Sequence, residues 1–111
     1  MALVIDRVEA LERVEGDVDL LRELVEVFLE DVPTRMAEIR EALERRDAEG
    51  LRSAAHSLKG AAANLSACAV SAAAERLEMA GRNQDFAETE SAYAVLVTET
   101  DRLTHELAEF A

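Results

Sequence analysis

The chain has 111 residues, with 24 acidic against 12 basic side chains and a formal net charge of −12 at pH 7. This length suits one compact domain, which we expect to span residues 1–111. The negative charge opposes binding to nucleic acid and to anionic lipid, so we expect no nucleic-acid partner and no direct membrane contact. Half the residues are hydrophobic but only 4% are aromatic, which favours helices over a sandwich rich in turns.

A short helix is predicted near the start of the chain, from Ile5 to Val14, and Gly16 is expected just beyond its end. Asp17 and Asp19 suit the beginning of a second helix, because a carboxylate there can accept hydrogen bonds from free backbone N–H groups.

The second predicted helix is long, because its apolar positions recur every three or four residues. This series continues past Pro33 without a change of phase: Leu21, Val25, Phe28, Val32, Met36, Ile39 and Leu43. We therefore expect one kinked helix. The alternative is a break into two helices at Asp31 or Val32, since proline removes a backbone donor.

Gly50 is expected to separate this segment from a helix over about Leu51 to Leu65, and a turn near Ser66 leads to a helix ending around Gly81 and Arg82. The last helix, which we expect to be the longest, has an apolar stripe of Phe86, Tyr93, Leu96, Thr100, Leu103, Leu107 and Phe110. Short connections favour antiparallel neighbours. The sequence thus predicts an all-α fold, an up-and-down antiparallel four-helix bundle with an additional short N-terminal helix.

Two features of the sequence bear on the cellular compartment in which the protein is found. Cys68 is the only cysteine and lies in an Ala-rich stretch, so we expect a buried small hydrophobe in a reducing compartment. The first residues mix acidic with apolar side chains and lack the pattern of a signal peptide. Both features predict a cytoplasmic protein.

His56 is the candidate for a chemically reactive residue in this sequence. On the helical wheel of its segment the apolar stripe consists of Leu51, Ala54, Ala55, Leu58, Ala62 and Leu65. His56 falls on the other side with Lys59 and Gly60, so the imidazole should face water. This position argues against a buried structural histidine and leaves an ordinary surface histidine as the alternative.

Gly60 lies inside a predicted helix, where glycine costs roughly 1 kcal/mol relative to alanine. One turn beyond His56, a residue without a side chain would leave room for a phosphoryl group or for another protein. Tight helix contact is the alternative, but the wheel places Gly60 opposite the contact stripe. Lys59 can reach the same face and pair with phosphoryl oxygens as a point charge.

The neighbouring helix is placed by counting, since antiparallel partners pair positions equidistant from the turn. Residues 76–78 should lie beside His56, so Glu78 and Arg82 are predicted to border the site. A solvated surface pair is the alternative for these two residues. His105 also falls off its helix's apolar stripe, but no cation or glycine stands at the corresponding positions, so we expect an ordinary surface residue.

The segment His56-Ser57-Leu58-Lys59-Gly60, preceded by Ala55 and followed by AAANL, resembles the signature of histidine phosphotransfer (HPt) domains. The stretches GDVDLLRELVEVFLEDVP, IREALERRD and RLEMAGR are similar to the family's flanking helices, in the same order and spacing. Ser66 departs from the pattern, because the family commonly has glycine at that turn.

The resemblance implies a phosphorelay intermediate in which His56 is the phosphoacceptor and Lys59 the neighbouring cation. Gly60 would be the residue that leaves space beside the ring. Glu78 and Arg82 would occupy positions that border the site. His56 would accept a phosphoryl group reversibly from a receiver-domain aspartate and donate it to another receiver. The receiver, part of a response regulator or a hybrid sensor histidine kinase, would hold the Mg²⁺.

Under this hypothesis the chain is a monomeric signalling module rather than an enzyme, with no cofactor or nucleotide site of its own. Two other classes of function stay open. One is a module that docks a receiver or a kinase without being phosphorylated. The other is a metal-dependent helical enzyme, although the sequence lacks an HExxH motif and paired cysteines.

Overall fold

The computed structural model describes residues 6–110 of the chain and the side chains as far as residue 108. Five helices make up the described part: α1 (Arg7–Arg13), α2 (Val18–Arg45), α3 (Ala48–Asn64), α4 (Cys68–Arg82) and α5 (Phe86–Phe110). These described residues contain no strand, which confirms the all-α prediction. The predicted helix start at Ile5 and the side chain of Phe110 lie outside the described part.

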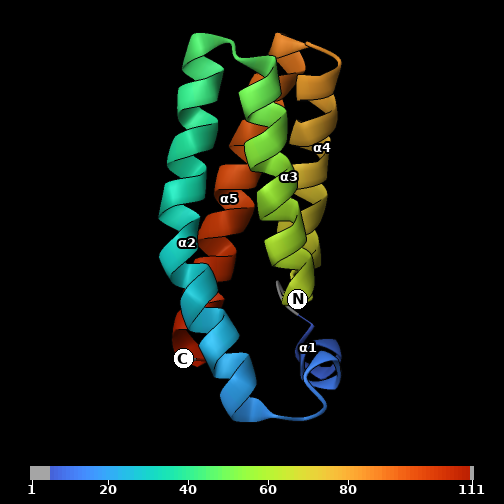
Figure 1. The fold of residues 1–111 in the computed structure, drawn as a ribbon, viewed down its shortest axis with the longest axis vertical. Coiled ribbons are helices and arrows are strands. Elements are labelled where there is room, and N and C mark those ends of the chain that lie inside the picture. Colours follow the sequence, from blue (N-terminus) through green and yellow to red (C-terminus); the bar gives the residue numbers. More distant parts are fainter. Residues whose placement is uncertain (1–5, 111) are drawn as a thin grey trace.

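Helices α2 to α5 form the predicted up-and-down bundle (Figure 1). Each packs on the next along the chain, and α5 closes the ring by contacting α2. The short helix α1 lies at the lower end of Figure 1, near the start of α2. None of the helices within residues 6–110 is long and apolar enough to cross a membrane.

Aspartates begin four of the five helices. Asp6, Asp17 and Asp47 each accept a hydrogen bond from the backbone N–H three residues later, and Asp85 accepts one from Glu88. The cap at Asp47 shows that the prediction for Gly50 was wrong. Gly50 lies in the first turn of α3 and donates its N–H to Asp47, so the helix begins before this glycine.

Helix α2 is one continuous helix that includes Pro33, as the unbroken apolar register predicted. Pro33 is exposed, so its ring lies on the solvent side of the helix. The helix has 28 residues against 25 in α5, and the expectation that the last helix is the longest was therefore wrong. The missing proline N–H was not enough to end a helix whose buried face continues on both sides.

The α3–α4 connection is held by α1. Ser66 has φ +56°, in the left-handed region that favours glycine. Its carbonyl accepts a hydrogen bond from the N–H of Asp6, and its hydroxyl accepts one from Arg13 at 3.1 Å. Cys68 follows as the first residue of α4 and is exposed, so the prediction that it is buried was wrong. The Ala-rich surroundings did not reveal that this position faces outward.

Helices α3 and α4 make the most extensive helix–helix contact in the bundle. Small residues such as Ala55, Ala62 and Ala74 are fully buried between them and the rest of the core. Near the top, a Cβ atom on Gly81 would lie 3.4 Å from the carbonyl oxygen of Ala48. Small side chains therefore let the two backbones approach closely, which brings α4 within reach of side chains on α3.

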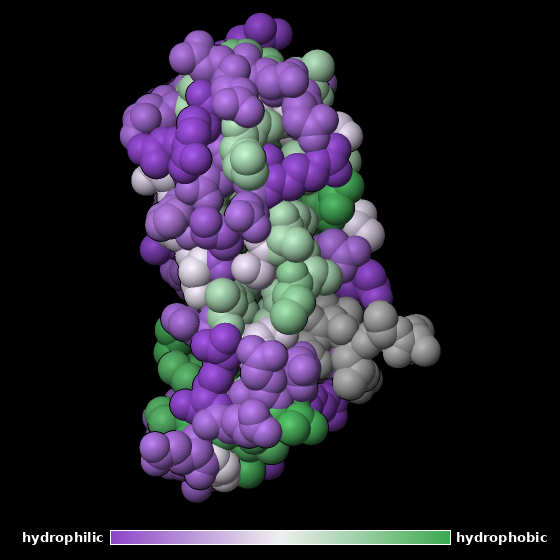
Figure 2. All heavy atoms as spheres, turned by 90° about the vertical axis from the view of Figure 1, so that its right-hand side faces the viewer, coloured by the Kyte–Doolittle hydropathy of each residue, from purple (hydrophilic) through white to green (hydrophobic). Residues whose placement is uncertain are grey.

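The surface shown in Figure 2 is hydrophilic over most of its upper part. Strongly apolar atoms gather toward the lower end, where α1 and the start of α2 lie in Figure 1. Val8 and Val18, both exposed, belong to these segments. On the face shown, the apolar part of the surface therefore lies toward the end of the molecule where α1 meets the start of α2.

Candidate functional site

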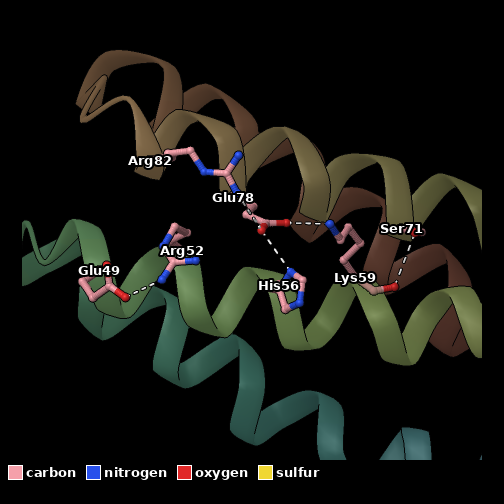
Figure 3. Close-up of polar contacts among 7 residues, drawn as sticks. All are labelled: Glu49, Arg52, His56, Lys59, Ser71, Glu78 and Arg82. Carbon is pink, nitrogen blue, oxygen red and sulfur yellow. Dashed lines mark hydrogen bonds and ion pairs between the residues drawn. The ribbon is translucent and has the colours of Figure 1, made fainter.

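His56 projects from the middle of α3 toward α4, with 63% of its side chain exposed (Figure 3). The wheel predicted this exposure. Its Nδ1 atom lies 3.0 Å from Oε2 of Glu78 on α4. Glu78 was predicted beside His56 from the antiparallel pairing of the two helices, and the structure places it there.

Glu78 is the buried centre of the site, with only 4% of its side chain exposed. Besides His56, two cations contact it. Lys59 Nζ lies 2.8 Å from Oε1, and Arg82 Nη2 lies 3.4 Å from Oε2. The alternative of a solvated Glu78–Arg82 surface pair is therefore wrong for Glu78, although Arg82 itself is exposed.

The surroundings of Glu78 favour its charged form. The hydrogen bond from Lys59 is the largest of the effects that lower the pKa of the Glu78 carboxyl below its ordinary value. Burial acts in the opposite direction, and the contact with His56 adds to the lowering. The carboxylate consequently remains ionised at neutral pH.

An ionised carboxylate fixes the tautomer of the neutral imidazole. A carboxylate can only accept hydrogen bonds, so Nδ1 of His56 must carry the proton and donate it to Glu78. The lone pair of the neutral ring then lies on Nε2, on the side of the ring that points away from Glu78 (Figure 3). The site thus presents a nucleophilic nitrogen to solvent.

Gly60 leaves the approach to this ring open. A Cβ atom on Gly60 would have no atom of the described chain within 4 Å among the neighbours that could obstruct it. Tight helix contact, the alternative explanation for this glycine, is therefore excluded within the described part. The open space above Gly60 is available to another molecule instead.

Two further contacts lie next to the site, and neither was predicted from the sequence. Ser71 on α4 donates its hydroxyl to the carbonyl oxygen of Lys59 at 3.4 Å, which ties α4 to the turn of α3 that holds Lys59. Arg52, one turn before His56, pairs with Glu49 of its own helix. The Glu49 contact is the main cause that raises the pKa of Arg52 above its ordinary value, and Glu78 adds to it.

The burial of Glu78 was the feature that the sequence reading missed most clearly. A signal was present, because Val70, Ala74 and Gly81 recur around Glu78 at spacings of three and four residues and are all buried. A carboxylate on an apolar stripe needs partners that keep its charge favourable. Lys59 and His56, predicted on the facing helix, were the available partners.

The family described as Hpt domain matches residues 23–110. The HPT domain from the Hpt sensor hybrid histidine kinase of Shewanella superposes with a TM-score of 0.84 and 19% identity, covering 96% of this chain and 92% of that chain. Histidine-containing phosphotransfer protein B (HptB) from Pseudomonas aeruginosa PAO1 superposes with a TM-score of 0.70 and 25% identity, covering 93% of this chain and 97% of that one. Among curated protein sequences, none is a significant match.

Proposed function

The chain belongs to the Hpt domain family, and from that premise we propose that His56 is the residue that carries the phosphoryl group. Membership gives the chain a phosphotransfer role in two-component signalling. The observation that supports His56 is its exposed ring, whose Nδ1 is held by the buried carboxylate of Glu78. His105 is also exposed, but it lies on α5, away from this carboxylate.

In the proposed step, the Nε2 lone pair of His56 attacks the phosphorus of a receiver's aspartyl phosphate. The N–P bond forms as the bond between phosphorus and the aspartate oxygen breaks, and the electron pair of that bond leaves with the aspartate carboxylate. No proton has to be transferred, because the ring becomes an imidazolium that keeps its Nδ1 proton. The reverse step donates the phosphoryl group to the aspartate of another receiver.

Glu78 would act as a positioning residue in this step. Its Oε2 atom lies 3.0 Å from Nδ1, where the carboxylate accepts the hydrogen bond of the Nδ1 proton and lies beside the positive charge that develops on the ring. Lys59 keeps that carboxylate ionised through the contact at 2.8 Å. We therefore assign Lys59 first to Glu78, and only then to the phosphoryl oxygens that the sequence reading gave it.

The partner would supply the rest of the chemistry. Receiver domains of a response regulator or a hybrid sensor histidine kinase would provide the aspartate and bind the Mg²⁺ that neutralises the phosphoryl charge. In this proposal the chain needs no cofactor of its own and hydrolyses no ATP. It would work as a monomer in the cytoplasm, where it meets its receivers.

The test is transfer of radiolabelled phosphate from a phosphorylated receiver with Mg²⁺ to the chain. We expect an acid-labile phosphoramidate in the wild type and in His105→Gln, and no label in His56→Gln. Both histidines are exposed, so the two variants are matched in chemistry and should both fold. Labelled His56→Gln would contradict the site assignment.

The docking alternative gives a different result in the same experiment. A module that only binds would form a complex with the receiver, yet it would take no label under conditions in which a known transfer pair is active. Calorimetric binding measured beside the transfer reaction separates the two functions.

A further inference from the structure

Arg52 lies on the same face of α3 as His56, one turn earlier in the helix. At about 100° per residue the two positions differ by only about 40° around the helix axis, so their side chains leave the helix in nearly the same direction. Helical side chains lean toward the N-terminus of their helix, which brings the imidazole over the turn that holds Arg52. Figure 3 shows Arg52 between Glu49 and His56. A cation that the proposed transfer step does not use therefore lies beside the ring.

The other two cations of the site are already engaged. Lys59 and Arg82 both contact the buried carboxylate of Glu78, at 2.8 and 3.4 Å. Moving Lys59 to a phosphoryl group would take away the closest partner of this carboxylate, whose side chain is only 4% exposed. A buried charge that loses its partner is strongly destabilised. Lys59 is therefore held at Glu78, and a cation with a weaker present contact is better suited to bind the phosphoryl oxygens.

The present contact of Arg52 is easily exchanged. Its guanidinium pairs with the carboxylate of Glu49, three residues earlier on the same helix. The Glu49 side chain is 78% exposed, and an ion pair in water contributes little to stability. A phosphoryl group carries about two negative charges and forms stronger, bidentate contacts with a guanidinium. Arg52 can therefore leave Glu49 without uncovering a buried charge.

The spacing along α3 suits this exchange. Glu49 precedes Arg52 by three residues, and His56 follows it by four. Residues three and four apart are neighbours on the surface of a helix. The guanidinium of Arg52 is consequently within reach of the Glu49 carboxylate on one side and of a group bound to the imidazole on the other.

We propose that Arg52 exchanges partners when His56 is phosphorylated, leaving Glu49 to bind the phosphoryl oxygens on Nε2. This inference rests on the proposed function of His56 and adds the residue that holds the group after transfer. Because Arg52 stabilises the phosphorylated state more than the free state, it shifts the transfer equilibrium toward this chain. Glu49 competes for Arg52 in the free state and shifts the equilibrium back toward the receiver.

The test measures the equilibrium of phosphate transfer between a receiver with Mg²⁺ and each variant, at concentrations at which the free proteins predominate. We expect Arg52→Gln to lower the equilibrium constant for phosphorylation of the chain about fivefold, and Glu49→Gln to raise it about twofold. The double variant should match Arg52→Gln alone, because Glu49 acts through Arg52. Arg52→Lys keeps the charge but not the planar fork, so its constant should lie between those of the wild type and Arg52→Gln.

Arg102 and Glu99 on α5 provide the matched controls. They form an ion pair with the same spacing of three residues, on a helix whose main contacts are with α2 and α4. Arg102→Gln and Glu99→Gln change the net charge of the chain by the same amounts and should leave the equilibrium constant at its wild-type value. Glutamine is a good helix former, so all the variants should fold, which circular dichroism checks.

Several outcomes would overturn the role of Arg52 alone. One is a constant that is unchanged in Arg52→Gln, or that changes only in Arg82→Gln. Slower transfer in both directions with an unchanged constant would mean that Arg52 only helps the receiver to bind. Shifts of the same sign in Arg52→Gln and Glu49→Gln would mean that the pair only supports α3, and additive effects in the double variant would mean that no exchange occurs.

A different result concerns the function on which the inference rests. If the wild-type chain takes no label on His56 from a phosphorylated receiver, the proposed function and the role of Arg52 are overturned together.

Discussion

Nδ1 of His56 and Oε2 of Glu78 lie 3.0 Å apart, in a contact that joins α3 to α4 across 22 positions of sequence. One partner is buried and the other is exposed, so the buried carboxylate determines which nitrogen of the exposed ring has the lone pair. The orientation of the imidazole thus depends on a residue that solvent and partner proteins cannot reach.

Replacing Glu78 with glutamine should change the tautomer of His56. The neutral amide can accept from Nδ1 or donate to it, so the preference for a protonated Nδ1 weakens, and nitrogen NMR should detect a mixture of tautomers. Phosphotransfer should slow about tenfold, which corresponds to about 1.4 kcal/mol. Glu75→Gln, an exposed glutamate on the same helix, is the control and should retain both properties.

The stability of the protein should depend on the ionisation of Glu78. Its pKa is lower in the folded protein than its ordinary value, so the ionised carboxylate stabilises the fold above that value, and this stabilisation is lost as pH falls through the lower folded value. The difference in unfolding free energy between wild type and Glu78→Gln should therefore shrink below about pH 5. Urea unfolding at several pH values measures it, and a difference independent of pH would refute this link.

Gly60→Ala should stabilise the fold while impairing function. Alanine is favoured over glycine inside a helix by about 1 kcal/mol, and the new Cβ atom meets no obstruction within 4 Å in the described chain. Transfer from a receiver should slow several-fold because the methyl group occupies the approach to the ring, and Gly60→Gln should be slower still. Thermal unfolding and transfer rates measured on the same samples check both effects. An unchanged rate of transfer in Gly60→Gln would show that the open space at residue 60 has no role in transfer.

Ser66 allows the cost of its left-handed backbone to be measured. Ser66→Ala removes the hydroxyl that accepts from Arg13 but keeps a Cβ atom at φ +56°, whereas Ser66→Gly removes both. The glycine variant should therefore be more stable than the alanine variant by about 1 kcal/mol, as judged from urea unfolding. Equal stability of the two would mean that this turn is not strained.

The periodicity of the apolar residues was enough to predict the bundle. It was not enough to predict where each helix begins or which side chains near the turns are exposed. The apolar register of α2 outweighed Pro33, because a continuous buried face stabilises a helix more than one lost hydrogen bond destabilises it. Gly50 misled the prediction of the start of α3, although Asp47 three residues earlier had the features of a helix cap. The exposure of Cys68 depends on how the α3–α4 turn directs the chain, which composition does not encode.

The residues of the site could be predicted from the sequence, but the contacts between them could be predicted less well. The wheel and the antiparallel count placed His56, Lys59 and Glu78 together. The sequence could not show that Lys59 contacts Glu78, because that contact depends on how closely α3 and α4 approach.

Lys59 is the only lysine in the sequence, and its ammonium lies 2.8 Å from the buried carboxylate at the centre of the site. Isotopic labelling of lysine alone would therefore place a single reporter beside His56, with no background from any other lysine. If His56 carries the phosphoryl group as proposed, the side-chain resonance of Lys59 should shift when the group arrives and return when it leaves, without a radioactive donor and without altering one residue of the protein.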